Sequence, residues 1–374
     1  MKYITVGDCC EILDSQRKPI TAKDREKGNI PYYGANGIQD YVNDYIFDDE
    51  LVLVAEDGGN FGSKTKPIAY RVSGKCWVNN HAHVLKPKKE MNVDYLCYSL
   101  MFYNTVGLVN GATRQKLTQA SLRNMEIPKL PMNDQIKIVN RLQTILNIRS
   151  MRKKQLEMLD SLVKSRFVEM FGNPVANEKG WEISLCKNLM SKIGSGATPK
   201  GGKESYCDEG ISLIRSMNVY NNRFEYKDLA HITDDQAGQL ENVTIEKKDV
   251  LLNITGASVA RCCVVPDDLL PARVNQHVSI IRCKERILPE FLCCMFTEDN
   301  YQRLLWNIAT AGGATREAIT KQQIEELMLI VPPIDLQRQY ITFVKRIDKL
   351  KSAVQAALDK TQLLFDSLMQ EYFG

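Results

Sequence analysis

Two long stretches of the chain have apolar residues at the spacing of a coiled-coil helix. Residues 134–170 contain neither proline nor glycine, and their apolar side chains recur at alternating intervals of three and four. Residues 335–372 repeat this pattern. The spacing places the apolar side chains on one narrow stripe of each helix, which is typical of a coiled-coil seam. Polar residues interrupt the seam near its centre, Arg149 and Arg152 in the first helix and Lys351 and Thr361 in the second.

A helix of this length measures about 55 Å at about 1.5 Å per residue. We therefore expect the two helices to pair with each other in antiparallel orientation and to join two globular domains. The alternative is that each helix packs only on its own domain, but the apolar stripe is long and narrow for that role. Asn133 or Asp134 is expected to cap the first helix, and Asp335 the second.

The same nine-letter pattern occurs twice, as "NGATRQKLT" at residues 110–118 and "GGATREAIT" at residues 312–320. From residue 111 to 172 the chain matches residues 313–374 at a constant offset of 202, without a gap. Upstream, "WVNNHAHVLKP" at residues 77–87 resembles "RVNQHVSIIRC" at an offset of 196. Earlier segments share only a pattern, a charged turn followed by an apolar strand and then glycine, as in "DDELVLVAEDGG" and "KKDVLLNITGAS". The chain is therefore an internal repeat whose halves keep one framework and differ in their early portions.

These patterns predict an α+β fold with two globular domains, two long helices and an internal two-fold repeat. A short helix is expected after each "GATR" loop, where Thr320 and Gln323 have the spacing of a capping box. The expected segments are a first domain at 1–132, a helical spacer at 133–175, a second domain at 176–333 and a second helical spacer at 334–374.

The composition narrows the class of protein. Hydrophobic residues make up 44% and charged residues 25% of the 374 residues, as in ordinary globular proteins. No apolar run is long enough to span a membrane and the N-terminal residues do not resemble a signal peptide, so we expect a cytoplasmic protein with no membrane partner. The 11 cysteines show no C-x-x-C spacing and are expected to be small core residues. A net charge of +4 permits a nucleic-acid partner without requiring one.

No motif predicts catalysis. "GSGATPKGG" at residues 194–202 lacks the G-K-[ST] ending of a phosphate-binding loop, so a loop that faces a partner is favoured over phosphate binding. His81 and His83 alternate as on a strand, but no further Cys, His or Asp residues complete a metal site. No G-x-S-x-G nucleophile elbow occurs.

The doubled layout resembles the specificity subunit of type I restriction–modification systems. The matching stretches include residues 30–59, "SGATPKGGKESYCDEGISLIRSMNV" at residues 195–219, "VNNH" and "VNQH", both "GATR" loops and both long helices. The resemblance covers essentially the whole chain. It implies two target-recognition domains that each read one half of a bipartite, asymmetric sequence of double-stranded DNA.

The resemblance also implies the partners. The helices would act as a spacer and as the docking surface for two methyltransferase subunits, and a restriction and translocase subunit would join the complex. The chain itself would be non-catalytic and would hold no cofactor or metal, because S-adenosylmethionine, ATP and Mg²⁺ are expected in the partner subunits. Two other functions stay open at this point, a coiled-coil adaptor that never binds DNA and a single-chain nuclease or methyltransferase with duplicated domains.

Candidate DNA contacts come from residue type and position. Arginine is the commonest direct reader of guanine, amides can bond adenine edges, and lysine or arginine binds phosphate. The candidates are Lys64, Lys66, Asn79, Asn80, His81, Arg114, Lys200, Lys203, Arg215, Asn218, Asn275, His277 and Arg316. For each of them an ordinary structural or surface role is the alternative: the arginines could hold their loops, and the amides could satisfy strand ends.

Overall fold

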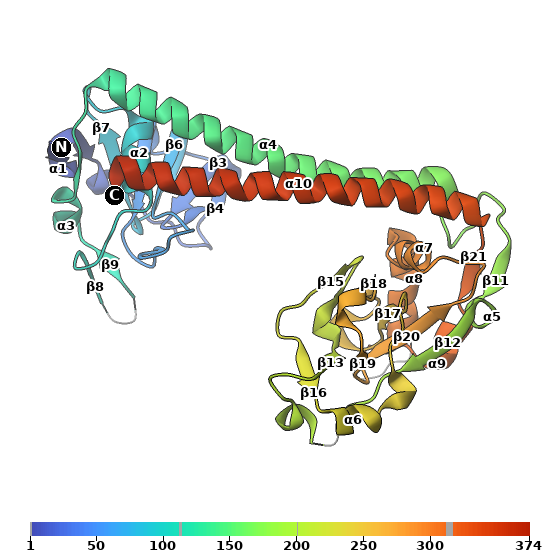
Figure 1. The fold of residues 1–374 in the computed structure, drawn as a ribbon. Helices are drawn as coiled ribbons and strands as arrows, with labels where there is room; N and C mark the ends of the chain where they lie inside the picture. The colour runs from blue at the N-terminus through green and yellow to red at the C-terminus, as the bar shows by residue number, and fades with distance from the viewer. Residues whose placement is uncertain (1, 112–113, 200, 312–316) are drawn as a thin grey trace. The chain divides into compact units, whose positions relative to one another are not determined.

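The computed structural model of the chain describes all residues except 1, 112–113, 200 and 312–316 (Figure 1). It divides into two compact units. Unit 1 comprises residues 1–154 and 354–374, and unit 2 comprises residues 155–353. Both units contain helices and strands, so the expected α+β class is confirmed. Each unit takes in part of both long helices, whereas the sequence-based division set these helices apart as spacers.

Unit 1 is built on a six-stranded sheet with the order β2-β7-β5-β6-β3-β4. Its strands are β2 (Cys10–Ile12), β3 (Lys27–Gly34), β4 (Gly37–Val42), β5 (Phe47–Ala55), β6 (Ala69–Val78) and β7 (Ala82–Pro87). The second half of β5, residues 51–55, is buried throughout, as its run of leucine, valine and alanine predicts for a central strand covered on both faces. Helix α2 packs against β5 and β6.

Short elements complete unit 1. They are β1 (Tyr3–Thr5), α1 (Val6–Cys9), η1 (Asp14–Gln16), α2 (Val93–Met101), β8 (Val109–Asn110), β9 (Lys116–Leu117), α3 (Gln119–Arg123) and β10 (Glu126–Pro128). Strand β1 pairs antiparallel with β10, and β8 pairs with β9 around the first "GATR" loop. The Thr118 side chain accepts a hydrogen bond from the Ser121 backbone N–H at the start of α3, which confirms the short helix expected there.

Unit 2 contains a four-stranded sheet, β12-β20-β17-β18, and a three-stranded sheet, β16-β13-β19. Its strands are β11 (Ile183–Leu185), β12 (Met190–Ser195), β13 (Ile211–Ile214), β14 (Val219–Tyr220), β15 (Arg223–Phe224), β16 (Ala230–Ile232), β17 (Val250–Asn253), β18 (Cys262–Val264), β19 (Ala272–Val274), β20 (Val278–Cys283) and β21 (Met328–Ile330). Its helices are α5 (Cys186–Leu189), η2 (Gly202–Ser205), η3 (Ser216–Asn218), α6 (Asp234–Gly238), η4 (Glu241–Val243), η5 (Gly256–Ser258), η6 (Asp267–Leu269), α7 (Pro289–Phe296), α8 (Asp299–Thr310) and α9 (Lys321–Glu325). Thr320 and Gln323 form the predicted capping box at the start of α9.

The two units share one framework, which confirms the repeat. In unit 1, β1 pairs with β10 and β7 lies between β2 and β5; in unit 2, β11 pairs with β21 and β20 lies between β12 and β17. Val52 opposes Leu85 in unit 1 as Val250 opposes Ile281 in unit 2. Next to them, β6 pairs antiparallel with β5 and β18 pairs antiparallel with β17. Beyond these strands the units differ, since unit 1 continues its sheet with β3 and β4 and unit 2 builds a separate sheet. The framework thus starts near each unit's first strand, earlier than the sequence match revealed.

The two long helices are α4 (Met132–Phe171) and α10 (Ile334–Phe373). Each begins slightly before the cap residues named from the sequence, so Asp134 and Asp335 lie inside the first turn and the capping prediction was wrong. Both carboxylates still lie where the helix dipole favours negative charge. The start of each helix is instead held by a buried glutamine, Gln135 or Gln337, which bonds to the preceding segment and to the turn before α2 or α7.

The two helices pair in antiparallel orientation within each unit, as predicted (Figure 1). In unit 1, Arg152 of α4 donates to the Ala357 carbonyl and to the Thr361 hydroxyl of α10. In unit 2, Lys351 Nζ lies 2.6 Å from Asp160 Oδ1, and Tyr340 donates to the Val163 carbonyl. Three of the polar residues that interrupt the apolar seam, Arg152, Lys351 and Thr361, therefore bond across the pair, a device that fixes register in coiled coils.

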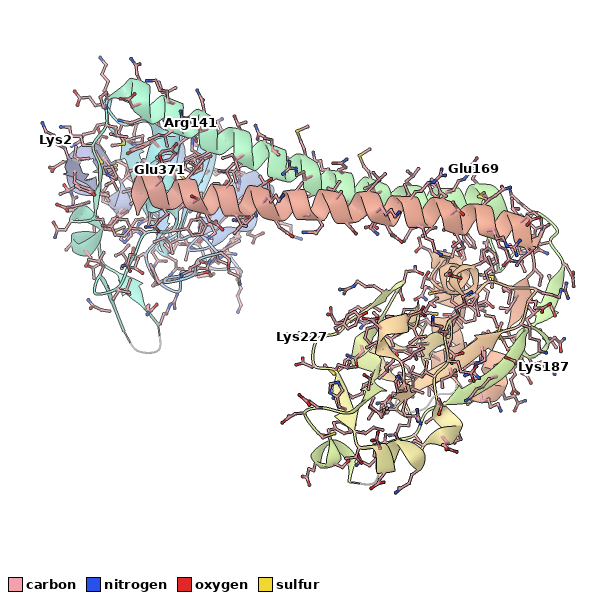
Figure 2. All side chains as sticks on the ribbon, viewed as in Figure 1. Lys2, Arg141, Glu169, Lys187, Lys227 and Glu371 are labelled. Carbon is pink, nitrogen blue, oxygen red and sulfur yellow. The ribbon has the colours of Figure 1, made fainter. Side chains whose placement is uncertain are left out.

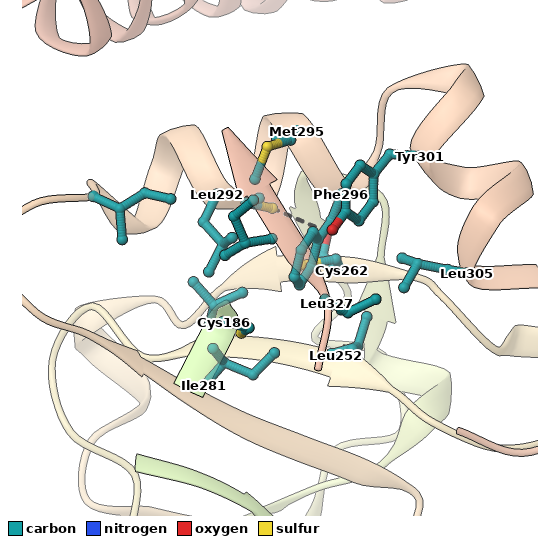
Figure 3. Close-up of a cluster of buried hydrophobic side chains, with 14 of the residues drawn as sticks. Cys186, Leu252, Cys262, Ile281, Leu292, Met295, Phe296, Tyr301, Leu305 and Leu327 are labelled. Carbon is teal, nitrogen blue, oxygen red and sulfur yellow. Dashed lines mark hydrogen bonds between the residues drawn. The ribbon is translucent and has the colours of Figure 1, made fainter. Parts of the chain in front are cut away.

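Each unit has an apolar core that includes both long helices. In unit 1, Leu142 of α4 and Phe365 of α10 join the core beneath α2. In unit 2, Phe296 and Tyr301 stack over a layer that includes Cys186 (Figure 3). The cysteines are mostly buried, as expected, and burial raises the pKa of Cys186 to about 12.

Charged side chains project from the surface of both units (Figure 2). Arg141 and Glu371 do so in unit 1, and Lys187 and Lys227 in unit 2. No helix among the described residues is both long enough and apolar enough to cross a membrane.

Candidate nucleic-acid interface

Two of the predicted DNA contacts in unit 1, His81 and Arg114, both contact the Asp57 carboxylate. Arg114 Nη2 donates to Asp57 Oδ1 at 2.7 Å, and His81 Nδ1 lies 2.8 Å from the same oxygen. Arg114 Nη2 is 3.4 Å from His81 Nδ1. The Arg114 side chain is 60% exposed and that of Asp57 18%. The sequence named the arginine and the histidine but missed the carboxylate that joins them, although it lies in the "EDGG" stretch that marks the end of β5.

Backbone hydrogen bonds hold these residues on one framework. The Leu117 N–H donates to the Glu56 carbonyl at 2.7 Å, and the Gly58 N–H donates to the Gln115 carbonyl at 3.2 Å. Gly58 has φ of +61°, a left-handed conformation that glycine adopts without strain, and a Cβ there would meet Arg114 Nε at 3.5 Å. The glycine turn therefore lets the guanidinium lie against the backbone.

A network of ion pairs lies behind this surface. Arg17 Nη1 lies 2.6 Å from Glu56 Oε2, and Lys116 Nζ lies 3.0 Å from Glu56 Oε1. His83 Nδ1 lies 2.7 Å from Asp14 Oδ2, and His83 Nε2 lies 2.9 Å from the Leu117 carbonyl. Because that carbonyl can only accept, His83 Nε2 carries a proton.

This arrangement argues against a metal site at Asp14, Glu56 and His83, whose ligand atoms lie within 4.8 Å of one another. Both Glu56 oxygens are already paired with cations, Arg17 and Lys116, so that carboxylate has no free oxygen for a metal ion. Burial by itself raises the pKa of the Asp14 carboxyl, but hydrogen bonds from His83 and from the Val84 backbone N–H outweigh it and hold that pKa below its ordinary range. We therefore interpret the cluster as a brace for the "EDGG" turn.

Asp14→Asn is expected to lower the free energy of unfolding by about 1–3 kcal/mol at pH 7, since it removes a buried charged acceptor. A carboxyl whose pKa is depressed in the folded state stabilises the fold above its unfolded pKa of about 3.9, and this contribution disappears as pH falls through the folded pKa. The difference in the free energy of unfolding between the Asp14→Asn variant and the parent should therefore become smaller below about pH 4. Urea unfolding at a series of pH values measures it.

Asp134→Asn provides the control for that series. Asp134 is an exposed carboxylate whose one ion pair among the described residues is with Lys137, 2.8 Å away on the same helix. Its replacement should change stability by at most about 0.5 kcal/mol. If Asp14→Asn lowers the free energy of unfolding at pH 7 by no more than Asp134→Asn does, the network does not brace the turn.

Unit 2 presents the same backbone framework with different side chains. The Ile319 N–H donates to the Ile254 carbonyl at 2.9 Å, and the Gly256 N–H donates to the Glu317 carbonyl at 2.9 Å. Thr255 takes the place of Asp57, and its Oγ1 lies 2.7 Å from His277 Nδ1. A hydroxyl thus occupies the position where unit 1 has the carboxylate, and both units place an imidazole beside it; Arg316, the counterpart of Arg114 in the repeat, lies outside the described residues.

Asn79 and Asn275 have the structural role that was the alternative at the sequence level. Both are buried, and each side-chain oxygen accepts the backbone N–H two residues on, at His81 (2.8 Å) and His277 (3.1 Å). Both amides shape the turn that presents the histidine. Asn80, by contrast, is exposed.

Arg215 and Asn218 are likewise tied into unit 2. Arg215 lies 5.7 Å from the Tyr206 ring centroid and donates to the Asp228 carbonyl. Asn218 is fully buried and donates to the Glu225 carbonyl at 2.9 Å. Asn218 therefore holds the "IRSMN" turn.

The remaining candidates are lysines and one arginine. Lys64 and Lys66 are exposed on the loop between β5 and β6. Lys200, Arg316 and the side chain of Lys203 lie outside the described part of the chain. Their roles as DNA contacts stay predictions.

The sequence and the fold resemble known proteins of one kind. A putative type I restriction enzyme specificity subunit of Haemophilus influenzae is 25% identical over 377 residues, which cover 96% of this chain and 90% of that protein. The S subunit of a type I restriction–modification system from M. genitalium has the same fold, with a TM-score of 0.59 at 13% identity over 100% of this chain and 96% of that one. A chain from a structure of the assembly and conformational transition of a type I system has a TM-score of 0.61 at 15% identity, over 100% and 97% of the two chains.

The family profile described as "Type I restriction modification DNA specificity domain" matches the chain twice, at residues 1–159 and 178–360. The two matches together include most of the chain and fall one on each copy of the repeat. The chain therefore belongs to the type I restriction–modification DNA specificity family.

Proposed function

We propose that the chain is the DNA-specificity subunit of a type I restriction–modification complex, and that each unit reads one half of a bipartite, asymmetric target. The observation that carries this proposal is the shared framework with unlike side chains. The same turn positions Asp57, His81 and Arg114 in unit 1 and Thr255 and His277 in unit 2. Because base readout depends on the hydrogen-bonding groups presented to the groove, unlike groups on one framework favour two different half-sites.

Repeat-related features also favour two copies of one partner, which we propose to be the methyltransferase subunits. On the long helices, two pairs of apolar residues occupy matching positions in the repeat. They are Ile148 with Leu350 and Leu162 with Leu364, and all four are exposed. Exposed apolar residues that recur in both copies are typical of a repeated docking surface.

Two hollows also recur at matching places. One, of about 870 Å³, includes Lys129 and Met132 at the start of α4, and the other, of about 650 Å³, includes Val331 and Ile334 at the start of α10. A partner that recognises this end of one long helix would find a related surface at the other.

The proposal places the chemistry in the other subunits. S-adenosylmethionine would bind the methyltransferase subunits, and ATP and Mg²⁺ would bind a restriction and translocase subunit. This chain would supply recognition alone, and the complex would work in the cytoplasm, where genomic DNA is found.

The test is to assemble the chain with its methyltransferase subunits, add S-adenosylmethionine, and map the methylated positions on genomic DNA. The expected target is split into two unlike halves separated by unread base pairs, with no modification when this chain is omitted. Methylation of one continuous motif would contradict the proposal. Equal methylation without the chain would favour the adaptor, and cleavage or methyl transfer by the isolated chain would favour the single-chain enzyme.

A further inference from the structure

We propose that Asp57 is a specificity-determining residue, which fixes the guanidinium of Arg114 so that this arginine reads a guanine in the half-site of unit 1. The inference rests on the proposed DNA-reading function and adds to it the base type and the positioning group. Arg114 is the residue that contacts DNA, and Asp57 acts through it.

The geometry around Asp57 is the first step of the argument. One carboxylate oxygen, Asp57 Oδ1, accepts from Arg114 Nη2 at 2.7 Å and lies 2.8 Å from His81 Nδ1. The carboxylate is mostly covered while the guanidinium is mostly exposed. The carboxylate is therefore the support, and the arginine is the group presented to a partner.

The support is itself held from both sides. The Asn36 side chain donates to the Gly58 carbonyl at 3.0 Å, and the Asn60 side chain donates to Asn36 Oδ1 at 3.0 Å. On the other side, Lys116 and Arg17 bond the preceding Glu56. A long arginine side chain loses less rotamer freedom on binding when its head is held beforehand.

Hydrogen-bond capacity then selects the base. A guanidinium has five N–H donors, and the contact to Asp57 uses one N–H of Nη2. In the part of the chain that the structure describes, Arg114 Nη1 and Nε have no hydrogen-bond partner. Each bidentate edge of a guanidinium includes Nη2, so the second N–H of Nη2 and a free N–H of Nη1 or Nε remain for the two acceptors of guanine in the major groove, N7 and O6.

Electrostatics favours the same assignment. An unpaired carboxylate at the DNA surface would be repelled by phosphates, but the contact with Arg114 neutralises Asp57 locally. The pair presents directional donors with little net charge, which suits base readout better than bulk attraction to phosphate. In unit 2 the Thr255 hydroxyl takes the place of this carboxylate, and we infer guanine readout for unit 1 alone.

The test uses the assembled complex with its methyltransferase subunits and DNA duplexes in which each position of the mapped target is changed in turn. The half-site of unit 1 is assigned by domain exchange. The parent should discriminate against a non-guanine base at one position of that half by about ten- to a hundredfold. Arg114→Ala should reduce this preference to below about threefold, and Asp57→Ala to an intermediate value, with the rest of the target read as before.

Three comparisons separate positioning from a general structural role. Asp57→Ala added to Arg114→Ala should cause no further loss of guanine preference, because Asp57 acts through the arginine. Thr255→Ala, the matched change in unit 2, should leave the guanine position unaffected. Lys153→Ala, an exposed lysine of α4, should weaken binding less than Arg114→Ala and alter no base preference.

Three results would overturn the inference while leaving the proposed function intact. The first is a unit 1 half-site without a G·C pair. The second is an Arg114→Ala variant that binds all sequences uniformly more weakly, as loss of a phosphate contact would cause. The third is an Asp57→Ala variant that keeps full guanine preference. If the parent complex methylates no split target, the proposed function itself fails.

Discussion

Phe171→Ala is expected to lower the free energy of unfolding of unit 2 by about 3–5 kcal/mol, the usual cost of removing a buried phenyl ring. Phe171 is fully buried in the last turn of α4. Its ring centroid lies 4.8 Å from that of Phe291 and 5.5 Å from that of Tyr340, so one side chain joins α4, α7 and α10. Urea unfolding followed by tryptophan fluorescence in a Trp77→Phe background measures the effect, because the two remaining tryptophans, Trp181 and Trp306, lie in unit 2.

Two matched variants calibrate this loss. Val168→Ala changes an exposed residue one turn earlier on the same helix and should alter stability by at most about 0.5 kcal/mol. Phe373→Ala removes the repeat-related ring at the end of α10, whose centroid lies 5.3 Å from that of Tyr95 but which is only partly buried, so unit 1 should lose less. Trp77 reports on unit 1 in a Trp181→Phe, Trp306→Phe background. Equal losses for Phe171 and Val168 would show that the two helices do not hold unit 2 together.

The features that follow from local periodicity could be predicted from the sequence. The three-and-four spacing of apolar residues requires a helix whatever surrounds it, and the constant offset of 202 requires a second copy. In the sequence, Arg152 and Thr361 are polar residues that interrupt the apolar seam. In the structure they bond to each other, because antiparallel pairing brings residues about two hundred positions apart to the same level.

The features that depend on contacts between distant segments could not be predicted. Asp57 follows β5, His81 lies in the turn between β6 and β7, which flank β5, and Arg114 reaches Asp57 because β9 returns to the "EDGG" turn. The residues next to Asp57 in the sequence give no indication that His81 and Arg114 contact it. Asn79 and Asn275 show a related limit, since an amide that shapes a turn and an amide that reads a base have the same letter in the sequence, and only burial and hydrogen bonding distinguish them.

The residues that hold the starts of α4 and α10 were also not predicted from the sequence. An aspartate after proline is typical of a cap, yet Pro131 and Pro333 allow the helix to begin at once, with φ already near its helical value. The side chains that do hold these starts, Gln135 and Gln337, match in the repeat, and their partners are backbone groups more than forty residues away. A repeat-matched polar residue inside an apolar stripe is the signal that could have found them.

Replacing residues 1–131 with those of a relative of known target is expected to exchange one half-site completely and to leave the other unchanged. The residues proposed to face DNA in unit 1 precede α4, whereas unit 2 builds its own framework from β11 to β21. The join before α4 should be tolerated because Gln135 bonds to backbone groups of the replaced segment, which any relative supplies. Each mismatched base pair costs about 1–3 kcal/mol, so a half-site of three pairs should shift preference by at least about a hundredfold.

Methylation mapping of the chimaera beside the parent measures this, and the reciprocal exchange of residues 176–333 is its control. The number of unread base pairs between the halves should stay the same in both chimaeras, because α4 and α10 are retained. A change in both half-sites after one exchange would show that the two units do not read independently. A change in the gap alone would mean that the globular part of unit 1, and not the helix pair, sets the spacing on DNA.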